Sequence, residues 1–192
     1  MSEYESHEYD VVVIGAGGAG LRAAIESARS GAKTAIICKS LLGKAHTVMA
    51  EGGAAAALGN ADDRDGWKTH FKDTMKGGKY LNNWRMAQIH AQESADRVRE
   101  LEQWGAVFDR TPSGLINQRN FGGHTYPRLA HVGDSTGLEI IRTLQEKGIH
   151  SGIDIFMEYT VSHLLQDKDG TCTGCVAYNR VDGAMHAYSA KS

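Results

Sequence analysis

Near the start of this 192-residue chain lies a glycine-rich loop whose residue types and spacing are typical of a binding site. Gly15, Gly17 and Gly20 fill a G-x-G-x-x-G frame directly after an apolar, β-branched run. In this frame the first glycine allows a sharp turn, the second lets a pyrophosphate approach the backbone, and the third lets a helix lie close to the strand. The loop therefore predicts a dinucleotide-binding site, lined by Gly15, Ala16, Gly17, Gly18, Ala19 and Gly20.

The elements around the loop are those that such a site requires. The run 9–14 predicts a buried parallel strand, and apolar residues at helical spacing predict a helix over 18–29. Gly31 is placed to end that helix, and 33–38 predicts a second parallel strand. Together they form a β-α-β unit of roughly 30 residues, with the helix N-terminus facing the phosphates.

The end of the second strand lacks a residue that a simple NAD site usually has. An Asp or Glu there normally binds the ribose hydroxyls, but this chain has Cys38, Lys39 and Ser40. Lys39 could bind an additional phosphate, so these residues alone leave an NADP site as an alternative.

The segment 40–60 is rich in Gly and Ala, which lets the backbone press against a flat ligand. Within it, the run from His46 to Gly53 resembles the flavin-attachment segment of the succinate dehydrogenase and fumarate reductase flavoprotein subunits. In that family the histidine carries FAD through a covalent bond. The resemblance covers nearly the whole chain and extends to Lys39, Trp67, Asp73-Thr74, Gly77-Gly78, Phe121-Gly122-Gly123 and Asp134-Ser135-Thr136-Gly137.

The resemblance implies a role for each matching position. The glycine loop would hold the FAD pyrophosphate, and Cys38, Lys39 and Ser40 would lie beside the adenosine half. The residues along the flavin would be Lys44, Ala45, His46, Thr47, Glu51, Gly52 and Gly53. The covalent bond would join His46 to the ring and raise its potential. Glu51 stands where the family has Glu or Gln, and it does not by itself fix the direction of the reaction.

A polar, glycine-containing stretch at 118–124 predicts a loop. The matching family loop lies at the dicarboxylate pocket, so the resemblance implies that Phe121 contacts the substrate; an aromatic plug beside a turn is the equal alternative. Four nearby side chains could attract a dianion, although each taken singly is expected to be an exposed surface residue. These four are Arg119, His124, Arg128 and His131.

The segment 134–139 predicts the start of a helix over 135–147. Thr136 and Glu139 have the spacing of a capping box, and Gly148 is placed to end the helix. The resemblance alone implies that this helix start lies near the flavin.

The three cysteines predict packing rather than chemistry. Cys172 and Cys175 form a C-x-x-C pair, but a zinc site would need two more ligands, and the flanking residues predict a turn that enters a strand. We therefore expect no metal site, and so few cysteines indicate a reducing compartment.

Composition predicts an ordered, soluble protein. Hydrophobic residues make up 41% and charged residues 23% of the chain, and no apolar run reaches the roughly 20 residues that span a bilayer. The acidic segment 1–6 has no signal-peptide core, and a net charge of -2 gives no reason to expect a nucleic-acid partner.

The remaining pattern predicts helices near 64–76 and 84–104, and strands near 153–165, 173–179 and 184–189 with a hairpin turn at 181–183. The fold class is therefore α/β: a Rossmann-like FAD-binding domain with a parallel sheet and an antiparallel β flap, incomplete at the C-terminus. We expect residues 1–192 to form one domain, the N-terminal portion of the family's FAD-binding domain. Its capping and C-terminal helical domains would be absent.

The resemblance implies interconversion of succinate and fumarate, with hydride transfer between the dicarboxylate and the flavin. Electrons would then leave through an iron-sulfur subunit to a quinone. Membrane anchor subunits would hold the complex at the inner face of the cell membrane, on the cytoplasmic side. The alternatives are another FAD oxidoreductase, such as L-aspartate oxidase or a soluble fumarate reductase, and a truncated, non-catalytic fragment.

Family members are about three times longer, and their main proton-transfer arginine lies beyond the position of Ser192. No catalytic acid can therefore be named here, and we expect the isolated 192 residues to be inactive in succinate oxidation.

Overall fold

The computed structural model describes residues 4–192. The expectation about segment 1–6 therefore falls partly on residues 1–3, outside the described part. The chain divides into two compact units, residues 1–48 with 144–192, and residues 49–143. Each unit is described by itself.

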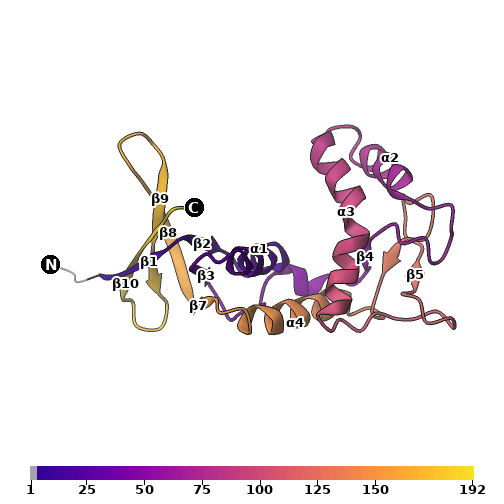
Figure 1. Ribbon diagram of the computed structural model, residues 1–192. Helices are drawn as coiled ribbons and strands as arrows, with labels where there is room; N and C mark the ends of the chain where they lie inside the picture. The colour runs from indigo at the N-terminus through magenta and orange to yellow at the C-terminus, as the bar shows by residue number, and fades with distance from the viewer. Residues whose placement is uncertain (1–3) are drawn as a thin grey trace. The chain divides into compact units, whose positions relative to one another are not determined.

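The first unit contains the predicted β-α-β unit (Figure 1). A parallel sheet has the order β2 (Val11–Ile14), β3 (Thr34–Cys38) and β7 (Asp154–Met157). The central strand β3 is buried at every residue, as expected of a parallel sheet. Helix α1 (Gly18–Arg29) buries Leu21, Ala24 and Ile25, and it ends just before Gly31, whose φ is +84°. The predicted strand–helix–strand order is confirmed.

The same unit holds an antiparallel flap with one parallel edge. Its strand order is β1 (Glu5–Tyr9), β10 (Met185–Ala190), β9 (Cys172–Asn179) and β8 (Tyr159–Gln166), and β1 runs parallel to β10. The predicted hairpin turn at 181–183 is confirmed. The Asn179 N–H donates to the Ala184 carbonyl, and the Gly183 N–H donates to the Asn179 carbonyl.

Two predicted strands are each divided between the two sheets. Residues 9–14 are interrupted at Asp10, whose carboxylate accepts hydrogen bonds from the Lys33 N–H at 2.8 Å and the Lys191 ammonium at 2.7 Å. Residues 153–165 are interrupted at Glu158, which has a φ of +65°. In each strand the apolar pattern continues across the break, so periodicity alone predicted continuous strands.

The second unit is built on helices α2 (Trp67–Gly77) and α3 (Trp84–Gln103). A small antiparallel sheet has the order β4 (Ala54–Ala55), β6 (Leu129–Ala130) and β5 (Gln118–Arg119). Its core is formed by Ala56, Val98, Ala106, Phe108, Ile116 and Ala130. Both helices lie close to their predicted positions, but strands of two residues are too short for a periodic signal. The predicted loop at 118–124 is therefore wrong at its first two residues.

Helix α4 (Thr136–Ile149) confirms the predicted helix, but its ends differ from the prediction. The Glu139 N–H bonds to the Ser135 carbonyl, while the Glu139 carboxylate accepts from the Val107 N–H at 2.8 Å and pairs with Arg142. The capping box expected from Thr136 and Glu139 is therefore not formed. Gly148 does not end the helix but lies within it, and a Cβ there would be 3.5 Å from the Leu21 side chain.

The three cysteines are free thiols. Cys38 and Cys175 are buried, as expected for packing residues, whereas Cys172 is exposed.

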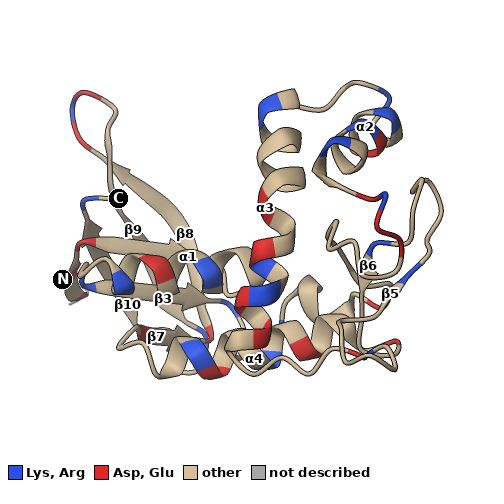
Figure 2. Cartoon of the chain, turned by 45° about the vertical axis from the view of Figure 1, so that its right-hand side comes forward, with Lys and Arg blue, Asp and Glu red and all other residues tan. Residues whose placement is uncertain are grey.

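Helix α3 carries both acidic and basic residues, whereas α2 has lysines at positions 68, 72 and 76 (Figure 2). Within residues 4–192, every helix falls short of the length and apolar character needed to cross a bilayer.

Candidate FAD site

The glycine loop after β2 has two glycines that the chain itself requires. Gly15 has a φ of +106°, which strongly favours glycine. A Cβ on Gly20 would lie 1.9 Å from the Gly15 carbonyl oxygen, so no larger residue fits there. This is the close strand–helix approach that the motif predicts.

Gly17 is different, because nothing in the protein excludes a side chain there. Its φ is -78°, and a Cβ would be 3.5 Å from the nearest atoms, in Ala45 and Thr47. A glycine that the fold does not need is what a loop requires when a ligand must approach its backbone. The loop therefore fits a pyrophosphate.

The N-terminus of α1 has the polarity that suits an anion. Its N-cap, Gly17, makes no side-chain cap, and the first turn contains no acidic residue. The partial positive charge of the helix end is therefore not neutralised by a carboxylate of its own first turn.

The structure brings the first part of the predicted flavin segment, residues 44–47, to this loop. Thr47 Oγ1 accepts a hydrogen bond from the Gly18 N–H at 3.1 Å, although the two residues are 29 positions apart. His46 begins a short 3₁₀ helix, His46–Met49, with its side chain exposed, as is that of Lys44. Ala45 and Thr47 therefore lie against the glycine loop, and His46 is free to meet a ligand.

The three predicted residues at the end of β3 differ in exposure. The Cys38 side chain is 6% exposed, its Sγ lies 3.5 Å from the Phe156 carbonyl oxygen, and burial raises the pKa of the thiol. Lys39 is exposed, and Ser40 donates to the Lys44 carbonyl at 3.2 Å. Of the three residues, Lys39 and Ser40 offer accessible side chains, whereas the Cys38 thiol packs in the core.

In the second unit, segment 50–53 is held by hydrogen bonds to its carbonyl groups. The Arg119 guanidinium donates to the Glu51 carbonyl at 2.7 Å and to the Gly52 carbonyl at 2.8 Å. The Gly137 N–H donates to the Ala50 carbonyl at 2.7 Å. The start of α4 and the end of β5 thus fix this backbone, a role for Arg119 that sequence analysis missed.

Both glycines of this segment lie close to other residues of the second unit. Gly53 has a φ of +126°, and a Cβ there would be 2.8 Å from the Ala130 carbonyl oxygen. A Cβ on Gly52 would be 3.5 Å from the Phe121 ring. Phe121 thus lies beside the glycine pair, and its side chain is 57% exposed, so much of the ring is open to a ligand.

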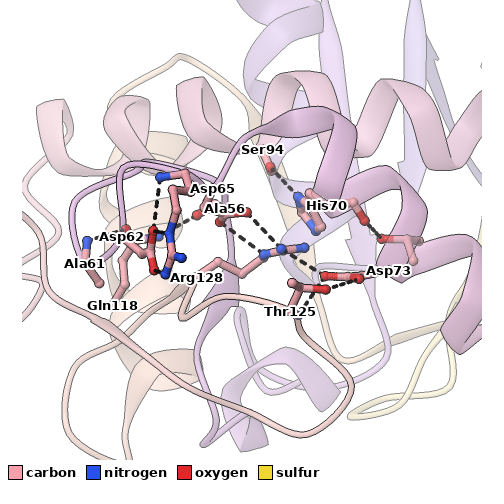
Figure 3. Close-up of polar contacts among 12 residues, drawn as sticks. Ala56, Ala61, Asp62, Asp65, His70, Asp73, Ser94, Gln118, Thr125 and Arg128 are labelled. Atoms are coloured by element: carbon pink, nitrogen blue, oxygen red, sulfur yellow. Dashed lines mark hydrogen bonds and ion pairs between the residues drawn. The ribbon is translucent and has the colours of Figure 1, made fainter.

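The surface positions expected for Arg128 and His131 are wrong. Arg128 is completely buried and pairs with Asp65 and Asp73 at 2.8 and 2.9 Å (Figure 3). His131 is 8% exposed, and its Nδ1 lies 2.8 Å from an Asp109 carboxylate oxygen. A buried arginine between two carboxylates is a structural group here and not a free attractor of anions.

The same network includes a buried histidine that the sequence pattern did not single out. His70 Nδ1 lies 3.5 Å from Ser94 Oγ (Figure 3). Burial, followed by the Arg128 charge, lowers the pKa of His70 to about 4. His124 is half-buried nearby, and burial and Arg128 also lower its pKa. Both rings are neutral at neutral pH.

Comparison with known proteins agrees with these features. The family profile described as FAD binding domain matches residues 10–192. A fumarate reductase (CoM/CoB) chain of Methanothermobacter marburgensis is 42% identical over 99% of this chain and 35% of the relative. A succinate dehydrogenase flavoprotein subunit of Rickettsia conorii is 41% identical over 96% of this chain and 32% of the relative.

Solved structures give the same result. The Sdh1 complex of Mycobacterium smegmatis in its apo form matches with a TM-score of 0.92 and 57% identity, over 98% of this chain and 34% of that one. A variant FrdA protein of E. coli quinol fumarate reductase matches with a TM-score of 0.92 and 36% identity, over 98% and 32% of the two chains. This chain thus spans about a third of the length of these relatives.

The predicted fold, a Rossmann-like FAD-binding domain with an antiparallel flap, is confirmed by these structural matches. The chain belongs to the FAD-binding domain family, in which its relatives include the flavoprotein subunits of succinate dehydrogenase and fumarate reductase.

Proposed function

We propose that this chain is the FAD-binding part of a succinate dehydrogenase or fumarate reductase flavoprotein subunit, with FAD attached through His46. The observation that carries the proposal is the contact between the glycine loop and the His46 segment, where Thr47 accepts the Gly18 N–H at 3.1 Å. This contact brings a pyrophosphate-binding backbone and an exposed histidine into the same unit.

Different segments of the chain would bind different parts of FAD. The loop 15–20 and the N-terminus of α1 would hold the pyrophosphate through backbone N–H groups. Lys39 and Ser40 would lie at the adenosine half. Lys44, Ala45, Thr47 and the segment 51–53 would lie along the flavin, and the hydrogen bonds from Arg119 would keep the Glu51 and Gly52 carbonyls fixed.

When bound, FAD supplies the redox chemistry, accepting hydride equivalents from a dicarboxylate and delivering electrons singly. The exposed ring of Phe121 would contact the dicarboxylate and exclude water from one side of it. We assign no proton donor within residues 4–192.

The partners follow from the same assignment. Electrons would pass to an iron-sulfur subunit and then to a quinone. Anchor subunits would hold the complex at the cytoplasmic face of the cell membrane. The relative named as a CoM/CoB fumarate reductase supports a second candidate, fumarate reduction with CoM and CoB.

The test uses the natively expressed protein that contains this chain. We expect succinate-dependent dye reduction that is lost in His46→Ala although FAD stays bound, and retained in His163→Ala, which changes an exposed histidine on β8. Activity with CoM and CoB in place of a quinone would support the second candidate. Noncovalent FAD with full activity in His46→Ala would contradict the attachment and support a soluble fumarate reductase or an L-aspartate oxidase.

A further inference from the structure

A second cluster of reactive side chains lies in the antiparallel flap, apart from the glycine loop. His7 Nε2 and His186 Nδ1 are 3.0 Å apart. A Glu5 carboxylate oxygen lies 3.5 Å from the same His7 nitrogen, and its other oxygen lies 3.7 Å from the same His186 nitrogen. One ligand atom from each of the two imidazoles and the carboxylate thus lies within 4.8 Å of the other two.

The strand register explains why these residues meet. Glu5 on β1 is directly opposite His186 on β10, and β1 runs parallel to β10. Side chains two positions apart on a strand share a face, so His7 joins Glu5 on the same side of the sheet. No local pattern indicates this cluster, because His7 and His186 are 179 residues apart.

Aromatic neighbours hold both imidazoles in place. The His7 ring stacks on Tyr188 at a centroid distance of 4.7 Å and meets the edge of Phe156 at 5.1 Å. The His186 ring packs edge-on against Tyr159 at 4.8 Å. Both donor nitrogens are therefore pre-positioned, as an ordered binding site requires.

Glu5 is the accessible member of the cluster. The side chains of His7 and His186 are 15% and 6% exposed, whereas that of Glu5 is 66% exposed. A ligand could enter from the Glu5 side without displacing the aromatic residues.

The donor atoms lie near the separations that a tetrahedral zinc ion requires. Zn–N and Zn–O bonds of about 2.0–2.1 Å place neighbouring ligands roughly 3.3–3.4 Å apart. The two nitrogens are 3.0 Å apart, and each has a different Glu5 oxygen near it, at 3.5 and 3.7 Å, while one ligand atom from each residue lies within 4.8 Å of the others. The exposed Glu5 side chain would therefore turn to bring one oxygen to the ion. Imidazole favours zinc and its neighbours, whereas Mg²⁺ and Ca²⁺ prefer oxygen ligands alone.

We propose that Glu5, His7 and His186 form a zinc site, with a water molecule in the fourth position, that fastens β1 to β10. His7 would bind through Nε2 and keep its proton on Nδ1, and His186 would bind through Nδ1 and keep its proton on Nε2. The bound ion would replace the direct contact between the two imidazoles. The site is separate from the glycine loop and does not depend on the proposed redox function.

The test is zinc titration of the natively expressed protein after chelator treatment, followed by calorimetry, with cobalt(II) as a spectroscopic substitute. We expect one high-affinity zinc ion per chain, the visible bands of tetrahedral cobalt, and a higher thermal midpoint with zinc. Glu5→Gln, at an exposed position that should fold normally, should weaken binding roughly tenfold or more. His7→Gln and His186→Gln should abolish this binding, whereas His163→Ala should leave it unchanged.

Two results would overturn the proposal. One is the absence of zinc binding by the unaltered protein, which would leave the two imidazoles joined only by a shared hydrogen bond. The other is zinc binding with the same affinity and stoichiometry in Glu5→Gln and in His7→Gln, which would place the ion elsewhere. Circular dichroism and FAD content would show that each variant is folded.

Discussion

The Arg128 guanidinium binds the Asp65 carboxylate with two hydrogen bonds, from Nε at 3.2 Å and from Nη2 at 2.8 Å, and both side chains are fully buried. Asp73 on α2 forms an ion pair with the same Nη2 at 2.9 Å. Its carboxylate also accepts hydrogen bonds from the Thr125 N–H and hydroxyl. Arg128 directly precedes β6. The network therefore ties the start of α2 and the helix itself to the small sheet of the second unit.

Removal of Arg128 should be strongly destabilising, because it leaves two carboxylates without their buried cation. We expect Arg128→Met to lower the free energy of unfolding by about 3–5 kcal/mol, measured by urea denaturation. Arg64→Met is the matched control, since Arg64 pairs with Asp62 at the surface and its loss should have little effect. Equal effects of the two substitutions would contradict this account.

His70 should make the protein less stable in mild acid. The unfolded imidazole takes up a proton near pH 6.5, whereas in the fold the pKa is about 4, so the unfolded state binds more protons between these values. Stability should therefore decrease as the pH falls from 6.5 to 4, by on the order of 3 kcal/mol for the whole shift. The measurement is the unfolding free energy at a series of pH values. His70→Gln should flatten the curve in this window, and an unchanged slope would contradict the assignment.

Two glycines of the nucleotide loop should respond differently to alanine. Gly20→Ala places a Cβ against the Gly15 carbonyl oxygen and should destabilise the fold and abolish FAD binding. Gly17→Ala meets no close protein atom, so it should fold normally but bind FAD at least roughly tenfold more weakly, because the backbone must approach a pyrophosphate. Thermal unfolding and FAD titration separate the two effects. Normal FAD affinity in Gly17→Ala would show that the loop does not hold the pyrophosphate as proposed.

Arg119 should act by holding segment 51–53. Its planar fork binds two successive carbonyl groups, and a lysine cannot reproduce that geometry. We expect Arg119→Lys to increase amide hydrogen exchange at Gly52 and Gly53 and to raise the KM for succinate in the native protein, while overall stability changes little. Unchanged exchange at both glycines would contradict the role.

Local signals were sufficient for the main elements. The β-branched runs, the helical spacing of Leu21, Ala24 and Ile25, and the glycine frame predicted the β-α-β unit correctly. Each depends on residues close in sequence, where strand and helix periodicity is strongest.

Features that depend on distant partners could not be predicted in this way. Arg128 is buried because Asp65 and Asp73, more than fifty positions away, neutralise it, and no local pattern records that pairing. The hydrogen bonds from Arg119 to segment 51–52 and the contact between His7 and His186 also join residues far apart in sequence, so local patterns did not predict them. Strands of two residues, such as β4 and β6, are likewise set by pairing and not by periodicity.

The most direct test of the central proposal is to denature the natively expressed protein, digest it and sequence its flavin-containing peptides by mass spectrometry. We predict that flavin fluorescence stays with the polypeptide and that the flavin mass is on His46. His46→Ala should bind FAD that is released on denaturation. Flavin released from the unaltered protein, or attached at another residue, would contradict the assignment of His46.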